Sequence, residues 1–137
     1  MKLLFDTNVV LDVLLNREPW VMTAKELWRS NDTGRISGFL TATTLTDIHY
    51  IARKAKGLAS AREAVQLCLT AFEICSVERS DLEQAAALPG NDFEDNLQIA
   101  VAFQDGLDAI VTRNPVDYGD SLVAVFTPEE AWGHLSD

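Results

Sequence analysis

The chain of 137 residues is 47% hydrophobic and 23% charged, which suits one ordinary globular domain. Its formal net charge of −10 excludes a surface that binds nucleic-acid phosphates broadly through basic residues. No apolar run reaches membrane-spanning length, and we expect no secretory signal peptide because Asp6 interrupts the first apolar residues. Cys68 and Cys75 match no zinc or redox spacing, so we expect core thiols in a cytoplasmic protein.

The first predicted strand, Lys2–Phe5, is short and apolar, and the carboxylate of Asp6 follows it directly. A helix is predicted from Thr7 to Leu15, because Thr7 and Asn8 can cap it and its apolar residues follow helical spacing. A carboxylate at such a junction lies at the carboxyl edge of a parallel sheet, where α/β proteins hold their ligands. For one Asp alone, helix capping explains the pattern, but further acids occupy similar places.

The rest of the chain alternates predicted helices and strands, separated by turn residues. No repeat or linker divides it, so we expect a single domain spanning residues 1–137. This alternation indicates an α/β fold with a central, mostly parallel sheet of four or five strands flanked by helices. Further strands are predicted at 35–40, 72–77, 109–112 and 122–126, a polar loop at 113–120, and further helices at 19–30, 44–56, 60–71, 81–88, 92–105 and from 127 onward.

Acidic, amide and hydroxyl side chains recur where predicted strands end or predicted helices begin. If the strands are parallel, Asp6, Thr112 and Asn114 reach the same edge of the sheet. Asp92 and Asp95 are three residues apart and therefore share a helix face. The acids and amides that we expect to gather there are Asp6, Asp47, Asp92, Asp95, Asn114 and Asp117.

Carboxylates gathered in this way point to a bound cation. They repel one another and raise one another's pKa values, so the cluster is stable only when a cation neutralises it. Oxygen ligands without a His or Cys cluster select Mg²⁺ or Mn²⁺ over zinc. Such a centre activates water and stabilises the displacement of a phosphodiester. Each acid also has a structural explanation: helix capping for Asp92 and Asp95, a solvated helix position for Asp47, and a turn for Asp117.

All of these side chains except Asp117 fall within four segments, Phe5–Val9, Thr43–Ile48, Asp92–Gln98 and Ile110–Asn114. In this order and spacing, the segments resemble the PIN-domain family, and in particular its VapC-like toxin ribonucleases. The resemblance covers nearly the whole chain. It implies a PIN-like three-layer α/β sandwich with a pocket of three or four acids.

The resemblance also implies a role for each matched residue. Asp6 and Asp95 look like metal ligands, and Asp47 stands where the family more often has Glu, which is one methylene longer. By this resemblance, the acids Asp6, Asp47, Asp92 and Asp95 form the catalytic set, and short polar supports are expected from Thr7, Asn8 and Thr112.

The end of the fourth predicted strand departs from the family pattern. Asn114 stands where many members have Asp, so Asp92 or Asp117 would supply the missing charge. Asp92 ranks first because it shares a helix face with Asp95. Arg113 is predicted to contact phosphate beside the pocket, unless it pairs with an acid instead.

By this resemblance, the predicted function is a Mg²⁺- or Mn²⁺-dependent endoribonuclease that cuts RNA and is the toxin of a toxin–antitoxin pair. By resemblance we expect a homodimer and an antitoxin peptide in a groove between the early helices. The alternative is a non-catalytic PIN-fold binding module whose metal site is weakened at Asp47 and Asn114. A phosphotransferase of the haloacid-dehalogenase type is disfavoured, because that chemistry needs a second Asp two residues after Asp6, where this chain has Asn8.

Overall fold

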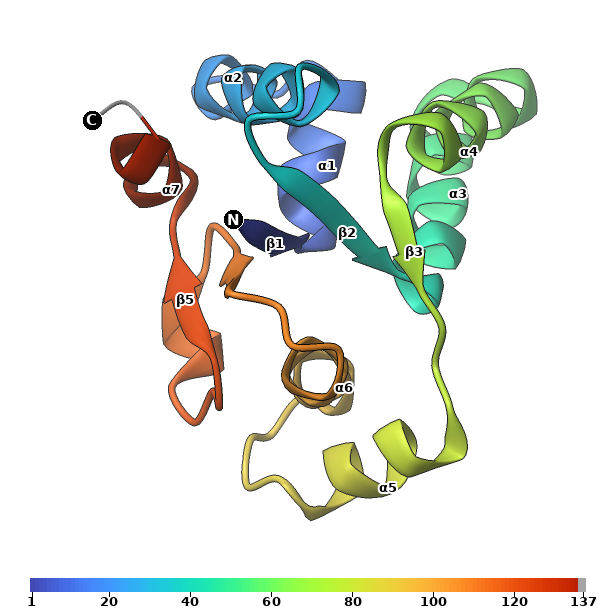
Figure 1. Ribbon diagram of the computed structural model, residues 1–137. Coiled ribbons are helices and arrows are strands. Elements are labelled where there is room, and N and C mark those ends of the chain that lie inside the picture. The colour runs from blue at the N-terminus through green and yellow to red at the C-terminus, as the bar shows by residue number, and fades with distance from the viewer. Residues whose placement is uncertain (136–137) are drawn as a thin grey trace.

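Five short strands form one sheet at the centre of the molecule, whose computed structural model describes residues 1–135 (Figure 1). The strand order is β3-β2-β1-β4-β5, so the first strand lies in the middle of the sheet. Every neighbouring pair is parallel, as the alternation of strands and helices predicted. The strands are β1 (Lys2–Phe5), β2 (Ser37–Thr41), β3 (Glu73–Cys75), β4 (Ala109–Val111) and β5 (Ala124–Phe126).

Helices cover both faces of the sheet and make three layers (Figure 1). Leu3 and Phe5 of β1 pack into a core with α1 to α4 and α7, whereas Leu4 packs on the opposite face with α5 and α6. Within residues 1–135, no helix is long and apolar enough to cross a membrane. The helices are α1 (Thr7–Leu14), α2 (Val21–Asp32), α3 (Ala42–Lys56), α4 (Leu58–Ala71), α5 (Arg79–Ala87), α6 (Phe93–Gln104), α7 (Pro128–Leu135) and the short 3₁₀ helix η1 (Pro115–Tyr118).

The central strands end at one edge of the sheet, and β1 and β2 are followed there almost directly by helices α1 and α3. The backbone N–H of Asp6, just after β1, donates to the carbonyl of Val111 in β4 at 2.9 Å. Thr41, the last residue of β2, caps α3 by accepting a hydrogen bond from the backbone N–H of Thr44. Side chains at the starts of α1 and α3 are therefore brought to the same edge.

Two boundaries near the second strand differ from the prediction. Helix α2 lies two residues later than predicted at both of its ends. Strand β2 begins at Ser37 and not at residue 35, because the backbone N–H groups of Arg35 and Ile36 donate to the carbonyl of Ser30, at 2.9 and 3.3 Å. Those donors are therefore unavailable for pairing with a neighbouring strand.

Other predicted boundaries were wrong for local reasons. Helix α4 begins at Leu58 and not at residue 60, because Gly57, with a φ of 92°, separates α3 from α4 in a single residue. Helix α5 is capped by Glu78 and Asp81, whose side chains bond each other's backbone N–H groups, and not by Ser80. The predicted polar loop at 113–120 contains η1, and β3 is shorter than the strand predicted at 72–77.

Candidate active site

Asp6 lies at the carboxyl end of the central strand, where four hydrogen bonds hold its buried carboxylate. Its Oδ1 accepts from the backbone N–H of Thr7 at 2.7 Å, which caps α1, and from Gln98 Nε2 at 3.0 Å. Its Oδ2 accepts from Thr112 Oγ1 at 2.7 Å and from Asn8 Nδ2 at 3.4 Å. Asp6 is therefore a helix cap, and its carboxylate is also fixed by side chains from three separate segments.

Asp6 forms part of the wall of a cavity of about 500 Å³, which we call the acidic hollow. The wall also includes Asn8 and Asn114, and it combines residues of α1, α3, α6 and the segment after β4. The structure thus brings together all the acids that the sequence singled out. Six carboxylates line the hollow: Asp6, Asp47, Asp92, Glu94, Asp95 and Asp117.

Asp95 lies in the first turn of α6 beside Asp92, which caps that helix. Asp92 Oδ1 accepts a hydrogen bond from the backbone N–H of Asp95 at 3.0 Å. Burial raises the pKa of Asp95 to about 6, and the negative charges of Asp92 and Asp6 add to this increase. The hydrogen bond that Tyr118 OH donates to Asp95 at 3.1 Å acts in the opposite direction and lowers this pKa.

Glu94 is a member of the acidic hollow that the sequence reasoning missed. Its pKa is raised to about 8, first by a hydrogen bond with Asp47 and then by burial and nearby negative charge. The prediction considered only the helix face that Asp92 and Asp95 share, whereas in the structure Glu94, between them in sequence, also lines the hollow.

Gln98 and Tyr118 are two further residues that the sequence reasoning missed, and they connect the two predicted metal ligands. Gln98 Nε2 donates to Asp6 Oδ1 at 3.0 Å and to Tyr118 OH at 3.2 Å, and Tyr118 OH donates to Asp95. Burial, together with the charges of Asp6 and Asp95, raises the pKa of Tyr118 and keeps it a donor. Gln98 lies three residues after Asp95 on the same helix, a spacing that could have identified it. Tyr118 lies in the predicted polar loop, where no spacing pointed to it.

Arg113, the predicted phosphate contact, is engaged in an ion pair outside the acidic hollow. Its Nε lies 2.9 Å from Oδ2 of Asp12, a residue of α1 whose side chain is fully buried. Its guanidinium also lies 3.9 Å from the centre of the Trp20 ring. Burial raises the pKa of Asp12, and the charges of Arg113 and Arg17 oppose this increase. Of the two roles considered for Arg113, phosphate contact and pairing with an acid, the structure shows pairing with an acid.

The donor atoms of the acidic hollow fit a hard divalent cation in kind, because they are carboxylate and amide oxygens. A hydrogen bond with Asp47 for Glu94, burial for Asp95 and, after these, nearby negative charge raise the pKa values of both groups. Within residues 1–135, however, no three His, Cys, Asp or Glu side chains converge closely enough to hold a metal ion as they stand. Asp47 is half-buried and Glu94 is exposed.

A five-stranded parallel sheet with helices on both faces and acids at its carboxyl edge defines a PIN-like α/β domain. The sequence profile of the family described as PIN domain matches residues 2–115. The chain therefore belongs to the PIN-domain family. None of the curated proteins matches the chain in sequence.

Solved structures of toxin–antitoxin proteins have the same fold. DNA-bound VapBC from Salmonella typhimurium is 17% identical, with a TM-score of 0.72 over 93% of this chain and 98% of that chain. A toxin–antitoxin complex from Klebsiella pneumoniae is 23% identical, with a TM-score of 0.67 over 91% and 96%. VapC20 of Mycobacterium tuberculosis, described as a sarcin–ricin loop cleaving toxin, is 19% identical, with a TM-score of 0.66 over 79% and 86%. At these identities the likeness shows the fold alone.

Proposed function

We propose that this chain is a Mg²⁺- or Mn²⁺-dependent endoribonuclease that hydrolyses RNA phosphodiester bonds, and that it is the toxin of a toxin–antitoxin pair. The observation that carries the proposal is the acidic hollow, where six carboxylates of the described residues, from four segments of the chain, meet at the carboxyl edge of the sheet. Buried acids with a structural role are normally paired with cations of the protein. Among the described residues, the six carboxylates of the hollow share one lining arginine, so their negative charge requires a further cation.

In this proposal, Asp6 and Asp95 are the direct metal ligands. A bound divalent cation would supply an activated water and would stabilise the negative charge of the displaced phosphodiester. The four hydrogen bonds to Asp6 hold its oxygens in place, and Tyr118 holds Asp95. Asp47 and Asp92 would hold a second ion or orient water from the wall of the hollow. Asn114 and Asp117 would act as supports, since both line the hollow and both are exposed.

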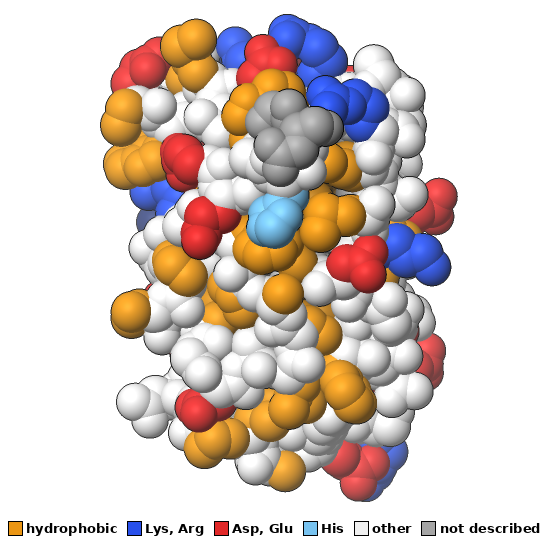
Figure 2. Space-filling view, turned by 60° about the vertical axis from the view of Figure 1, so that its left-hand side comes forward, with side chains coloured by type: hydrophobic (Ala, Val, Ile, Leu, Met, Phe, Trp, Pro, Cys, Tyr) orange, Lys and Arg blue, Asp and Glu red, His pale blue; other side chains and the backbone are white. Residues whose placement is uncertain are grey.

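The net charge of −10 agrees with a mechanism in which the metal centre, and not the general surface, meets the RNA. Figure 2 shows that on the face around the C-terminal helix, the described Lys and Arg side chains are interspersed with Asp and Glu and form no continuous band. RNA would therefore be held close to the hollow and not across a broad basic face.

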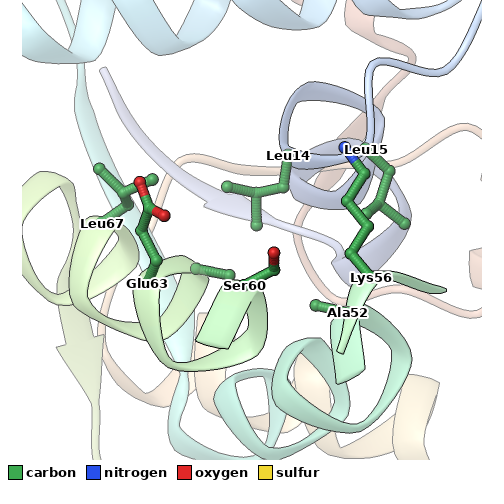
Figure 3. A pocket seen from close by; sticks show the side chains of 8 residues that line it. Leu14, Leu15, Ala52, Lys56, Ser60, Glu63 and Leu67 are labelled. Atoms are coloured by element: carbon green, nitrogen blue, oxygen red, sulfur yellow. The ribbon is translucent and has the colours of Figure 1, made fainter. Parts of the chain in front are cut away.

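An antitoxin partner is proposed from a second region, which we call the apolar groove. One part of it, of about 170 Å³, lies between α1, α3 and α4, and it is lined by Leu14, Leu15 and Leu67 together with polar residues (Figure 3). An adjoining part of about 420 Å³ shares Leu14 and Leu67 and adds Trp28 from α2. Such a groove suits the apolar face of a peptide helix. The VapBC structures of the same fold are toxin–antitoxin assemblies, which supports this partner.

We further propose that residues 1–137 form a single PIN-like domain and that the protein acts in the cytoplasm as a homodimer. The family profile spans most of the chain, and the described strands belong to one sheet, which supports a single domain. The dimer stays a prediction that rests on the resemblance, and the cytoplasmic location stays a prediction that rests on the cysteines and on the expected absence of a signal peptide. Size-exclusion chromatography with light scattering measures the oligomeric state.

A nuclease assay on pools of single-stranded and structured RNA tests the proposed activity. Cleavage is expected with Mg²⁺ or Mn²⁺, and a chelator should abolish it. Asp6→Asn keeps the cap and the shape of the side chain but removes its charge, so we expect at least a thousandfold loss of cleavage with a retained fold. Glu83→Gln, at an exposed site on α5, is the matched control and should cleave as the parent protein does. Cleavage by Asp6→Asn at the parent rate would contradict the assignment.

A specific observation also favours a second candidate, a non-catalytic PIN-fold binding module. Within the described residues no three potential ligands converge on a metal site, and the shorter Asp47 and the uncharged Asn114 weaken the acidic hollow. In that case the acidic hollow would have no measurable affinity for Mn²⁺, and RNA would remain intact in the presence of the metal.

A further inference from the structure

The last turn of α1 places Arg17 beside the acidic hollow through a defined helix ending. Asn16 adopts a left-handed conformation, with φ of 53°, and its backbone N–H donates to the carbonyl of Val13 at 3.2 Å. The backbone N–H of Arg17 then donates to the carbonyl of Asp12 at 3.0 Å. These two bonds form the Schellman ending of a helix, which turns the chain back over its own last turn. The backbone of Arg17 is therefore fixed by α1.

Arg17 lines the acidic hollow, and it is the only Lys or Arg among the described lining residues. It is 32% exposed, and its Nη1 lies 3.9 Å from Oδ1 of Asp12, at the outer limit of an ion pair. A guanidinium at that distance from its acid keeps most of its hydrogen-bonding fork available to another group.

Arg113 explains why Asp12 does not need Arg17 as its main partner. Arg113 Nε lies 2.9 Å from Asp12, its side chain is only 21% exposed, and the Trp20 ring covers the guanidinium. This closer contact compensates the buried charge of Asp12. The two arginines therefore have different surroundings: Arg113 is paired with Asp12 and covered by Trp20, and Arg17 lines the hollow.

We propose that Arg17, and not Arg113, binds a phosphate of the RNA strand in the acidic hollow. This inference rests on the proposed endoribonuclease function. A strand of RNA brings negative charge into a hollow that already holds six carboxylates. Arg17 supplies the positive charge at one part of the wall, and its planar fork matches two phosphate oxygens. It thereby fixes where the strand can lie relative to the carboxylates.

The test measures binding of a labelled single-stranded RNA oligonucleotide to the Asp6→Asn protein, which is expected to bind without cutting. In that background, Arg17→Gln should bind about tenfold more weakly than the parent, because one charged contact is lost. The slope of log affinity against log salt concentration should fall by about 0.7, the value for one phosphate contact on a single strand. Arg17→Lys should keep the salt slope, since it keeps the charge. Thermal unfolding of all variants is measured in parallel.

The matched control is Arg79→Gln, because Arg79 is a highly exposed arginine on α5 whose ion pair with Glu83 lies outside the hollow. It should leave both affinity and salt slope unchanged. If Arg17→Gln matches this control, the inference is overturned while the nuclease proposal stands. If Arg17→Gln lowers the melting temperature as much as Arg113→Gln does, Arg17 is a structural partner of Asp12 and the inference is again overturned. If the wild-type protein neither binds nor cuts RNA, both proposals fail.

Discussion

The surroundings of Asp12 and the acidic hollow both contain buried or half-buried carboxylates, but they differ in whether a cation of the chain compensates the negative charge. Asp12 is completely buried, and a cation of the same chain lies 2.9 Å away. Asp6 and Asp95 in the acidic hollow have hydrogen-bond donors but no cation of the chain within ion-pair distance, among the described residues. An uncompensated buried carboxylate lowers stability. Asp12 is therefore a structural acid, whereas Asp6 and Asp95 need a positive charge from outside the chain.

The largest effect on stability is expected at Asp12, whose buried charge is compensated by Arg113. Arg113→Gln leaves the buried charge of Asp12 with Arg17 alone, at 3.9 Å, so the free energy of unfolding should fall by about 3 to 5 kcal/mol. Urea denaturation measures this change. The double variant Asp12→Asn/Arg113→Gln removes both charges and should recover part of the loss. A loss below about 1 kcal/mol in the single variant would mean that Asp12 is not a structural acid of the kind described.

A smaller effect of pH is expected from the acidic hollow. Folding raises the pKa of Asp95 from 3.8 to about 6 and that of Glu94 from 4.5 to about 8, so the folded protein binds these protons more tightly than the unfolded chain. The free energy of unfolding should therefore fall as pH rises from about 4 to about 8. One pKa unit corresponds to about 1.4 kcal/mol and solvent screening reduces the contribution of the exposed Glu94, so we expect a fall of about 2 to 3 kcal/mol, most of it from Asp95.

Glu94→Gln provides the control for this pH dependence. The variant should lose most of the fall in stability between about pH 6 and pH 8, the interval above the pKa of Asp95, because its amide does not titrate. Mg²⁺ or Mn²⁺ should likewise reduce the fall in the wild-type protein by neutralising the carboxylates. Denaturation at a series of pH values measures both effects, in chelator for the comparison with Glu94→Gln and with added metal for the effect of the ion. Stability that rises over this interval would contradict the described crowding of negative charge.

The smallest effect is expected at the hydrogen bond between Tyr118 and Asp95. The phenol donates to the carboxylate at 3.1 Å and lowers its pKa, so Tyr118→Phe should raise the pKa of Asp95 by about one unit. The aromatic ring and its packing are retained. Carbon-13 NMR titration of the Asp carboxyl groups measures the shift. An unchanged pKa would show that Tyr118 fills space without orienting Asp95.

Much of this arrangement could be predicted from the sequence because strand ends and helix starts carry strong local signals. Asp6 follows a short apolar strand and precedes helix caps, and Asp92 and Asp95 share one helix face. A parallel sheet brings such positions to one edge, and the structure places them around one hollow. The family profile agrees with the resemblance that these segments carried.

The residues that were missed depend on tertiary contacts that no local pattern encodes. Asp12 lies within an apolar helix, and its partner Arg113 is 101 positions away, so only the folded chain makes them a pair. Tyr118 belongs to a segment predicted as a polar loop, and its role follows from its contacts with Gln98 and Asp95. The prediction for Arg113 used sequence proximity to the site, whereas in the folded chain Arg113 pairs with Asp12 and Arg17 lines the hollow.

The most direct test of the account is isothermal titration of the metal-free protein with Mn²⁺. The wild-type protein should bind the ion, and Asp6→Asn should bind it more than about tenfold more weakly, because Asp6 is the proposed direct ligand. Glu83→Gln, which removes an exposed carboxylate on α5, should bind as the wild type does. An absence of measurable Mn²⁺ binding to the wild type, or equal binding by Asp6→Asn, would contradict the claim that the acidic hollow is a divalent metal site.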